Sequence, residues 1–361
     1  MNRKGLVLLS LMLATGLPIS LSAEQNHVIV VSGLGGAQEY RDRFYEWSIR
    51  LVDAAIDRHG IPADQVVFLA EQPDRDPDRI RARSTWENIQ TAIAEVAEHA
   101  ALDDLVLIVL IGHGSFSGSV SHFNLPGPDP TVVDFAVALN ELREQQVVFV
   151  NTATASGEFI AGLSGPKRTI ITATKTARER NETKFGEFFV EAFAGRVGPE
   201  FETPTATNSV KGIAIDDVAD ANKDGRTSLL EAFDYARRQV ARVYEESGLL
   251  LTEHAMLDDN GDGYGSDEPD PLTAGADGRI AQALFFTPSG RLTTAELETD
   301  DPTLMGLYAE RNAIEKRVLA HRTLRDGMDS AIYEQELERL LIDLALKNRE
   351  IRKAENEVSQ S

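Results

Sequence analysis

The chain has 361 residues and a strong acidic excess, with 36 lysines and arginines against 58 aspartates and glutamates. A net charge of −22 at neutral pH disfavours nucleic acid and anionic lipid as partners. Cysteine is absent, which excludes disulfides and thiol catalysis. The length allows a sizeable hydrophobic core and about two domains.

The N-terminal segment predicts a secretory signal peptide over residues 1–23. Arg3 and Lys4 precede an apolar run that ends at Pro18, and small residues follow at Ser22 and Ala23. An uncleaved membrane anchor is the alternative, but the apolar run is shorter than the roughly 20 residues that a span needs. We therefore expect an exported protein, periplasmic or secreted, with no membrane span after cleavage.

The segment 27–290 alternates strand and helix patterns. Six strands are predicted, at 27–32, 66–69, 105–111, 147–150, 168–174 and 283–286. Helices are predicted at 40–58, at 131–142 and after a capping box formed by Ser84 and Glu87. Repeated βα units of this kind predict an α/β fold with a mostly parallel sheet between helical layers.

Polar residues follow two of these strands where each strand ends. The strand 105–111 leads into Gly112-His113-Gly114, and the strand 147–150 leads into a loop that contains Thr154 and Ser156. Both strands are apolar throughout, as expected for central strands covered on both faces. Because ligands of open α/β sheets bind at the carboxyl ends of the strands, we expect His113 and Thr154 to meet there.

This pairing resembles the caspase and legumain superfamily of peptidases, including its bacterial members. In that superfamily a His-Gly follows one strand, and the catalytic cysteine follows the next in a loop such as Glu-Ala-Cys-x-Ser-Gly. Alignment of Ser156 and Gly157 with that Ser-Gly places Thr154 at the cysteine position. The resemblance covers about residues 27–290 and implies a caspase-like fold. It also implies His113 as the base and Gly114 as part of an oxyanion hole.

The threonine at this position leaves three functions open. An alcohol is a harder nucleophile than a thiol, so the first is an impaired peptidase homologue that binds peptide or a partner protein. The second is a calcium-dependent hydrolase with a His113–Thr154 dyad, or with Ser156 as the attacking hydroxyl. The third is a structural assembly protein that acts through its C-terminal helices.

The segment after the first strand departs from the family pattern. Legumains carry an asparagine there that orients the histidine, whereas this chain has Ser32 followed by glycines at 33, 35 and 36. The glycines lack the third glycine of the dinucleotide pattern and the Lys-Ser/Thr of a P-loop. They predict a strand-to-helix turn, with a role in shaping a cleft as the alternative.

Two acidic segments match calcium-binding loops. The first has the alternating oxygen ligands and the closing glutamate of an EF-hand loop, with candidate ligands Asp220, Asn222, Asp224, Arg226 through its carbonyl, Ser228 and Glu231. The second repeats only the first half of the pattern, with Asp258, Asn260, Asp262 and Tyr264. Its twelfth position is Pro269, which has no ligand side chain, so a structural role without calcium is the alternative.

The character of the sequence changes near residue 301. Two long helical stretches are separated by a turn at 325–330, and the second carries an apolar seam at Leu337, Leu341, Leu344 and Ile351. We expect an antiparallel helical hairpin that either packs on its own domain or forms an oligomerisation or partner arm. The predicted organisation is a signal peptide at 1–23, a caspase- and legumain-like domain at 24–300 and a helical tail at 301–361.

Overall fold

A computed structural model describes residues 25–102, 104–205, 208–216, 219–221, 226–285 and 330–358, together with several positions between 303 and 321. The predicted signal peptide at 1–23 lies outside these residues. Within the described part, no helix combines the length and the apolar character needed to cross a membrane.

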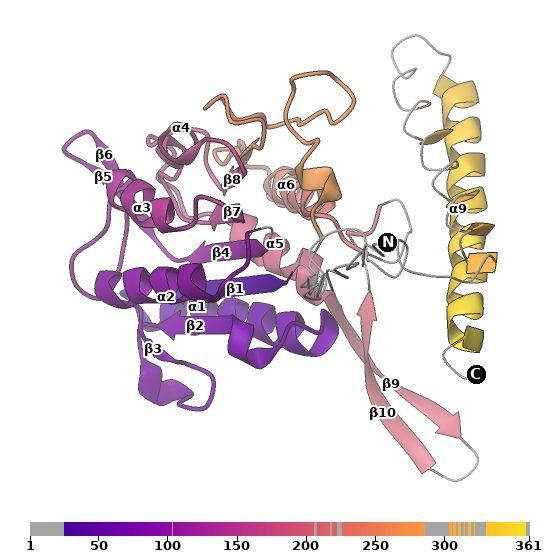
Figure 1. The fold of residues 1–361 in the computed structure, drawn as a ribbon, viewed down its shortest axis with the longest axis horizontal. Helices are drawn as coiled ribbons and strands as arrows, with labels where there is room; N and C mark the ends of the chain where they lie inside the picture. The colour runs from indigo at the N-terminus through magenta and orange to yellow at the C-terminus, as the bar shows by residue number, and fades with distance from the viewer. Residues whose placement is uncertain are drawn as a thin grey trace, which may run out of the picture.

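A seven-stranded sheet forms the centre of the molecule, in the order β11-β8-β7-β4-β1-β2-β3 (Figure 1). Its strands are β1 (Asn26–Ser32), β2 (Val66–Ala70), β3 (Ala82–Arg83), β4 (Leu105–Ile111), β7 (Gln146–Asn151), β8 (Arg168–Thr172) and β11 (Met256–Asp258). All neighbours pair in parallel except β11, which runs antiparallel to β8. The predicted α/β architecture is confirmed.

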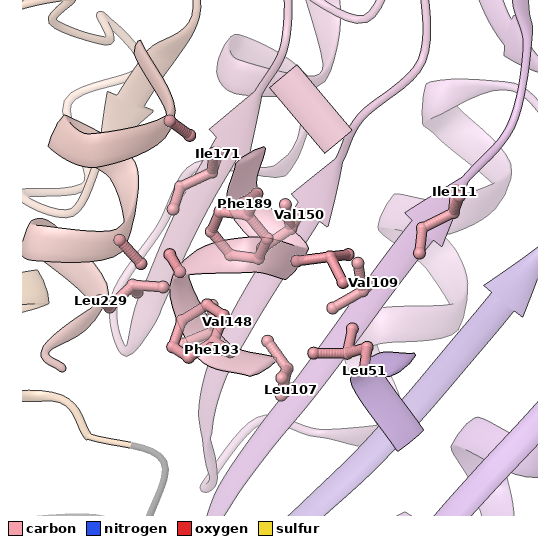
Figure 2. Packing of buried hydrophobic residues seen from close by; sticks show 14 of the residues in the cluster. Leu51, Leu107, Val109, Ile111, Val148, Val150, Ile171, Phe189, Phe193 and Leu229 are labelled. Carbon is pink, nitrogen blue, oxygen red and sulfur yellow. The ribbon is translucent and has the colours of Figure 1, made fainter. Parts of the chain in front are cut away.

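Helices cover both faces of the sheet, because successive side chains of the central strands point to opposite sides. One face packs against α1 (Gln38–Asp53), α5 (Phe185–Ala194) and α6 (Leu229–Glu246). The other packs against α2 (Trp86–His99), α3 (Val132–Ala138) and α4 (Glu158–Leu163). Figure 2 shows the first of these cores, where Phe189 and Phe193 of α5 lie over valines and isoleucines of the sheet.

The predicted sixth strand at 283–286 is wrong. Residues Ala281–Ala283 form a short 3-10 helix, because the buried Asp259 carboxylate accepts hydrogen bonds from the amides of Ile280 and Ala281 at 2.8 Å each. The sheet contains instead two short strands that were not predicted, β3 and β11, and β11 ends at Asp258, the first residue of the second acidic segment. Both are too short to show the periodic signal that identifies strands.

The predicted capping box of Ser84 and Glu87 is wrong, because the helix begins one residue later with a single side-chain cap. Thr85 is the N-cap of α2, and its hydroxyl accepts the amide of Asn88 at 3.4 Å. Ser84 is completely buried beneath the helix start.

Two hairpins were not anticipated by the sequence. β5 (Gly114–Ser117) and β6 (Val120–Phe123) follow β4 directly. β9 (Arg196–Thr205) and β10 (Asn208–Asp216) form a separate two-stranded sheet that extends away from the central sheet (Figure 1).

The C-terminal part contains one long helix, α9 (Ser330–Val358). Described helical positions before it contact α9 in reverse order: Leu304 packs near Ile351, Glu310 pairs with Lys347 at 2.6 Å, and His321 stacks on Tyr333. This order is that of two antiparallel helices. The buried seam of α9 comprises Leu340, Leu344, Asn348 and Ile351, while Leu337 and Leu341 are half-buried, so the predicted seam was partly misplaced.

Candidate functional site

The candidate site lies at the carboxyl ends of β1, β4 and β7. From β1 the chain builds the sheet to one side through β2, and from β4 it builds to the other side through β7 and β8. The gap between β1 and β4 is thus a topological switch point, the usual ligand position in open α/β sheets. His113 follows β4 and Thr154 follows β7, so the structure brings the two predicted residues to the same edge.

The side chain of Thr154 is bound to the backbone of Gly114. Its hydroxyl donates to the Gly114 carbonyl at 2.9 Å and accepts the Gly114 amide at 3.2 Å. Only 7% of Thr154 is exposed. The hydroxyl that would attack and the amide that would serve an oxyanion hole are therefore hydrogen-bonded to each other.

The imidazole of His113 is held by aromatic rings. It meets the rings of Tyr40 and Phe44 edge-on, with centroid distances of 4.5 and 4.9 Å. Among the described residues, no hydrogen bond joins the His113 imidazole to Thr154. Burial lowers the pKa of His113, while the carboxylate of Glu182 acts in the opposite direction. The rings of Tyr40 and Phe44, both on α1, thus orient the histidine.

Ser156 points away from the cleft. Its hydroxyl lies 3.1 Å from the hydroxyl of Thr174 and accepts the Thr174 amide at 3.2 Å, and Ser156 is 1% exposed. These contacts fasten the loop after β7 to the end of β8. In this position Ser156 supports the loop and does not face a substrate.

The ring of Phe123, from β6, packs against the glycines that follow β1 and β4. A Cβ atom at either Gly33 or Gly112 would lie 2.9 Å from this ring, so both strand ends must lack a side chain there. The amide of Asn124 donates to the carbonyl of His113 at 2.9 Å. The hairpin after β4 is thereby fixed across the ends of β1 and β4.

The loop 175–184 is attached to the candidate site by hydrogen bonds. The Glu179 carbonyl accepts the amide of Ala155 at 2.9 Å, next to Thr154. Glu182 accepts from Tyr40 at 3.2 Å and pairs with Arg43. Neither contact has a signal in sequence spacing, since 139 residues separate Arg43 from Glu182.

A second loop, 248–254, is hydrogen-bonded to the loop 175–184. The buried carboxylate of Glu253 accepts the amides of Lys184 and Phe185 at 2.8 and 2.7 Å, at the start of α5. Burial raises the pKa of Glu253 to about 7. His254 lies 2.9 Å from the Glu179 carboxylate. A lone acidic residue after a run of leucines gave no sequence signal for this role.

The described part of the first acidic segment fits a loop closed by Glu231. One carboxylate oxygen accepts the amide of Ala221 at 3.1 Å, and the other accepts the amide and hydroxyl of Ser228 at 2.9 Å each. Glu231 therefore joins the two ends of the loop, and Asp220 is buried beside it. Asn222 and Asp224 lie outside the described residues, while Arg226 stands over the ring of Phe285.

The second acidic segment holds itself together by its own side chains. Asp258 accepts the amides of Gly261 and Gly263 at 3.0 Å each, and Asp262 accepts the amide of Tyr264 at 2.7 Å. Asn260 accepts the amide of Asp262 at 2.8 Å. In the described part of the chain, no three acidic, histidine or cysteine side chains converge as metal ligands. These turns hold the segment in a defined conformation through hydrogen bonds between its side chains and its own backbone.

Comparison with known proteins gives no assignment by sequence: no family model matches the chain, and no curated protein does. Among solved structures, the chain is similar to the crystal structure of caspase-1 from Spodoptera frugiperda, with 11% identity and a TM-score of 0.38. The similarity covers 66% of this chain and 87% of that chain. The function proposed below therefore depends on the residues of this chain.

Proposed function

We propose that this chain is an exported, caspase- and legumain-like peptidase homologue that binds extended peptide or a partner protein without efficient cleavage. The observation that carries the proposal is the pair of hydrogen bonds between the Thr154 hydroxyl and the Gly114 backbone. An attacking alcohol needs a base on its proton, and here the proton is donated to a carbonyl instead.

The position of His113 supports the same function. Its ring packs edge-on against Tyr40 and Phe44, and its lowered pKa keeps it neutral near pH 7. A neutral imidazole could accept a proton, but the nearest candidate nucleophile is engaged elsewhere. The hydrolase that uses a His113–Thr154 dyad would have to break both Thr154 hydrogen bonds before each attack.

Calcium is the second part of the proposal. The ligands would come from Asp220, Asn222, Asp224, Ser228 and Glu231, with the carbonyl of Arg226. When bound, calcium would supply charge neutralisation in an acidic chain and would stabilise the native state. The joining of both loop ends by Glu231 supports this assignment.

The test is mass-spectrometric profiling of a diverse peptide mixture incubated with the mature chain and calcium. We expect no cleavage above that of Thr154→Ala and His113→Ala variants. Peptides retained by the immobilised chain should share a sequence preference, and Tyr40→Ala should weaken their retention because Tyr40 borders His113. Arg81→Ala is the matched control, since Arg81 pairs with Glu95 of α2 on the opposite face.

Either of two results would count against the proposal. Cleavage that is present in the wild type and absent from both the Thr154 and His113 variants would establish the dyad hydrolase. Retention that is equal in the wild type and Tyr40→Ala would move the binding site away from the cleft.

A further inference from the structure

The loop 248–254 exposes three consecutive leucines. Leu249, Leu250 and Leu251 are 64%, 87% and 38% exposed. The loop begins where α6 stops at Gly248, which has a φ of +64°, and the amide of Leu249 returns to the carbonyl of Tyr244 at 2.9 Å. A helix end of this form turns the chain sharply and fixes the residues that follow. The leucines are therefore presented by a defined backbone.

Two arginines of the loop 175–184 are also exposed. Within the described residues, Arg178 and Arg180 have no carboxylate within ion-pair distance. The guanidinium of Arg180 stands 5.7 Å from the ring centre of Phe116, on the hairpin that follows His113. Both side chains are exposed and are therefore available to the carboxylates of a partner.

Hydrogen bonds join these two loops into one surface. The amide nitrogen of Asn181 donates to the hydroxyl of Thr252 at 2.9 Å, and the Glu179 carboxylate meets both the amide and the ring of His254. Glu253 binds the backbone of Lys184 and Phe185. The leucines and arginines thus lie on segments that are held against each other, and we call Arg178, Arg180, Leu249, Leu250 and Leu251 the leucine–arginine surface.

We propose that the leucine–arginine surface binds a polypeptide segment in which apolar and acidic side chains lie close together. The apolar side chains of the partner would cover the leucines, and its carboxylates would pair with the two arginines. Such pairs are favourable because guanidinium and carboxylate match in geometry and charge. The inference rests on the proposed peptide- or partner-binding function and assigns the chemistry of the partner.

Charge complementarity favours a polypeptide over a membrane. Leucines beside arginines could also meet an anionic bilayer. A bilayer would bring an extended negative surface against a chain with a net charge of −22, whereas a short segment places its few carboxylates at the two arginines. The leucine–arginine surface is also linked to the candidate site, since the Glu179 carbonyl accepts the amide of Ala155, next to Thr154.

The experiment uses the mature chain and three fluorescein-labelled peptides of equal length, measured by fluorescence anisotropy. One peptide alternates Leu and Glu, the second alternates Leu and Lys, and the third alternates Ser and Glu. We expect the Leu-Glu peptide to bind most tightly. A Leu249→Ser, Leu250→Ser variant should bind it at least about tenfold more weakly, as expected when buried leucine contacts are lost.

Charge reversal provides the second arm. The variant Arg178→Glu, Arg180→Glu should lose affinity for the Leu-Glu peptide and gain affinity for the Leu-Lys peptide. The matched controls are Leu102→Ser, whose leucine is 65% exposed at the far end of α2, and Arg83→Glu on the edge strand β3. Both controls should bind the Leu-Glu peptide as the wild type does.

Three outcomes would overturn the proposal. The first is equal binding of all three peptides by the wild type. The second is binding that is weakened by Tyr40→Ala but unchanged in the leucine and arginine variants, which would leave the proposed cleft function standing. The third is tighter association with phosphatidylserine vesicles than with any peptide, lost in the leucine variant, which would identify the surface as a membrane contact.

Discussion

The hydroxyl of Thr154 donates a hydrogen bond to the Gly114 carbonyl at 2.9 Å and accepts one from the Gly114 amide at 3.2 Å. Replacement of Thr154 by valine keeps the shape of the side chain but removes both bonds. We expect a loss of about 1–3 kcal/mol in the free energy of unfolding, because a buried amide and carbonyl lose their partner. Thr154→Ser should lose less. Urea denaturation of the three proteins measures the difference, and equal midpoints for valine and threonine would contradict the pairing.

Gly114 should tolerate no side chain. A Cβ atom there would lie 2.1 Å from the Thr154 carbonyl oxygen, well inside contact distance. Gly114→Ala must therefore displace the loop after β7, and we expect a loss of about 1–3 kcal/mol of the kind caused by overpacking. Gly165→Ala is the control, since no atom lies within 4 Å of a Cβ at that position. If thermal unfolding ranks the two variants equally, the close approach is not present in solution.

The sequence predicted the positions that depend on local pattern and missed those that depend on long-range contact. Unbroken apolar runs located β1, β4 and β7, and the residues after them placed His113 and Thr154 at one edge. The direction of the Thr154 hydroxyl could not be predicted, because it depends on the Gly114 peptide from a hairpin without strong strand periodicity. The contacts between the loops 175–184 and 248–254 could not be predicted either, since Glu253 lies 69 residues from Lys184.

The stability of the protein should fall as the pH rises from about 4.5 to about 7 because of Glu253. Its pKa is raised to about 7, so the folded state keeps a proton that the unfolded state has already released. Stability is therefore greatest when Glu253 is protonated and declines as the pH rises, by roughly 3 kcal/mol over the full shift. Glu253→Gln should flatten this part of the profile.

The difference between the wild-type and Glu253→Gln stability curves isolates this contribution. Burial also raises the pKa of Asp277, to about 6, so both proteins should share a decline at lower pH. A parallel pair of curves from pH 6 to pH 7 would show that Glu253 titrates normally. Guanidinium unfolding at a series of pH values provides the measurement.

His113 should titrate below its ordinary value of 6.5, because burial between aromatic rings opposes its charge. Its contribution to stability is complete above pH 6.5 and is lost as the pH falls from 6.5 through the lower pKa of the folded state. Two-dimensional NMR of the imidazole carbons, assigned with His113→Gln, gives the midpoint directly. Phe44→Leu should move the midpoint toward the ordinary value by opening one side of the ring.

Calcium should raise the unfolding temperature through the first acidic loop. At ten times the dissociation constant, binding to the native state alone adds about 1.4 kcal/mol. Glu231→Gln should reduce this increment, while Asp262→Asn in the second segment should leave it unchanged. Differential scanning calorimetry with calcium and with chelator distinguishes the two loops. An increment lost in Asp262→Asn alone would assign the cation to the second segment.

Phe123 lies against both Gly33 and Gly112, so a single ring contacts the ends of two strands that are far apart in the chain. The two glycines differ in what else surrounds them. A Cβ atom at Gly33 would also lie 2.8 Å from the backbone carbonyl oxygen of Asn124, so a smaller residue at position 123 would not make room there. At Gly112 the nearest atom is the ring itself. A lineage that acquires a new ligand specificity at this site would accordingly change Gly112 and Phe123 together and would retain Gly33.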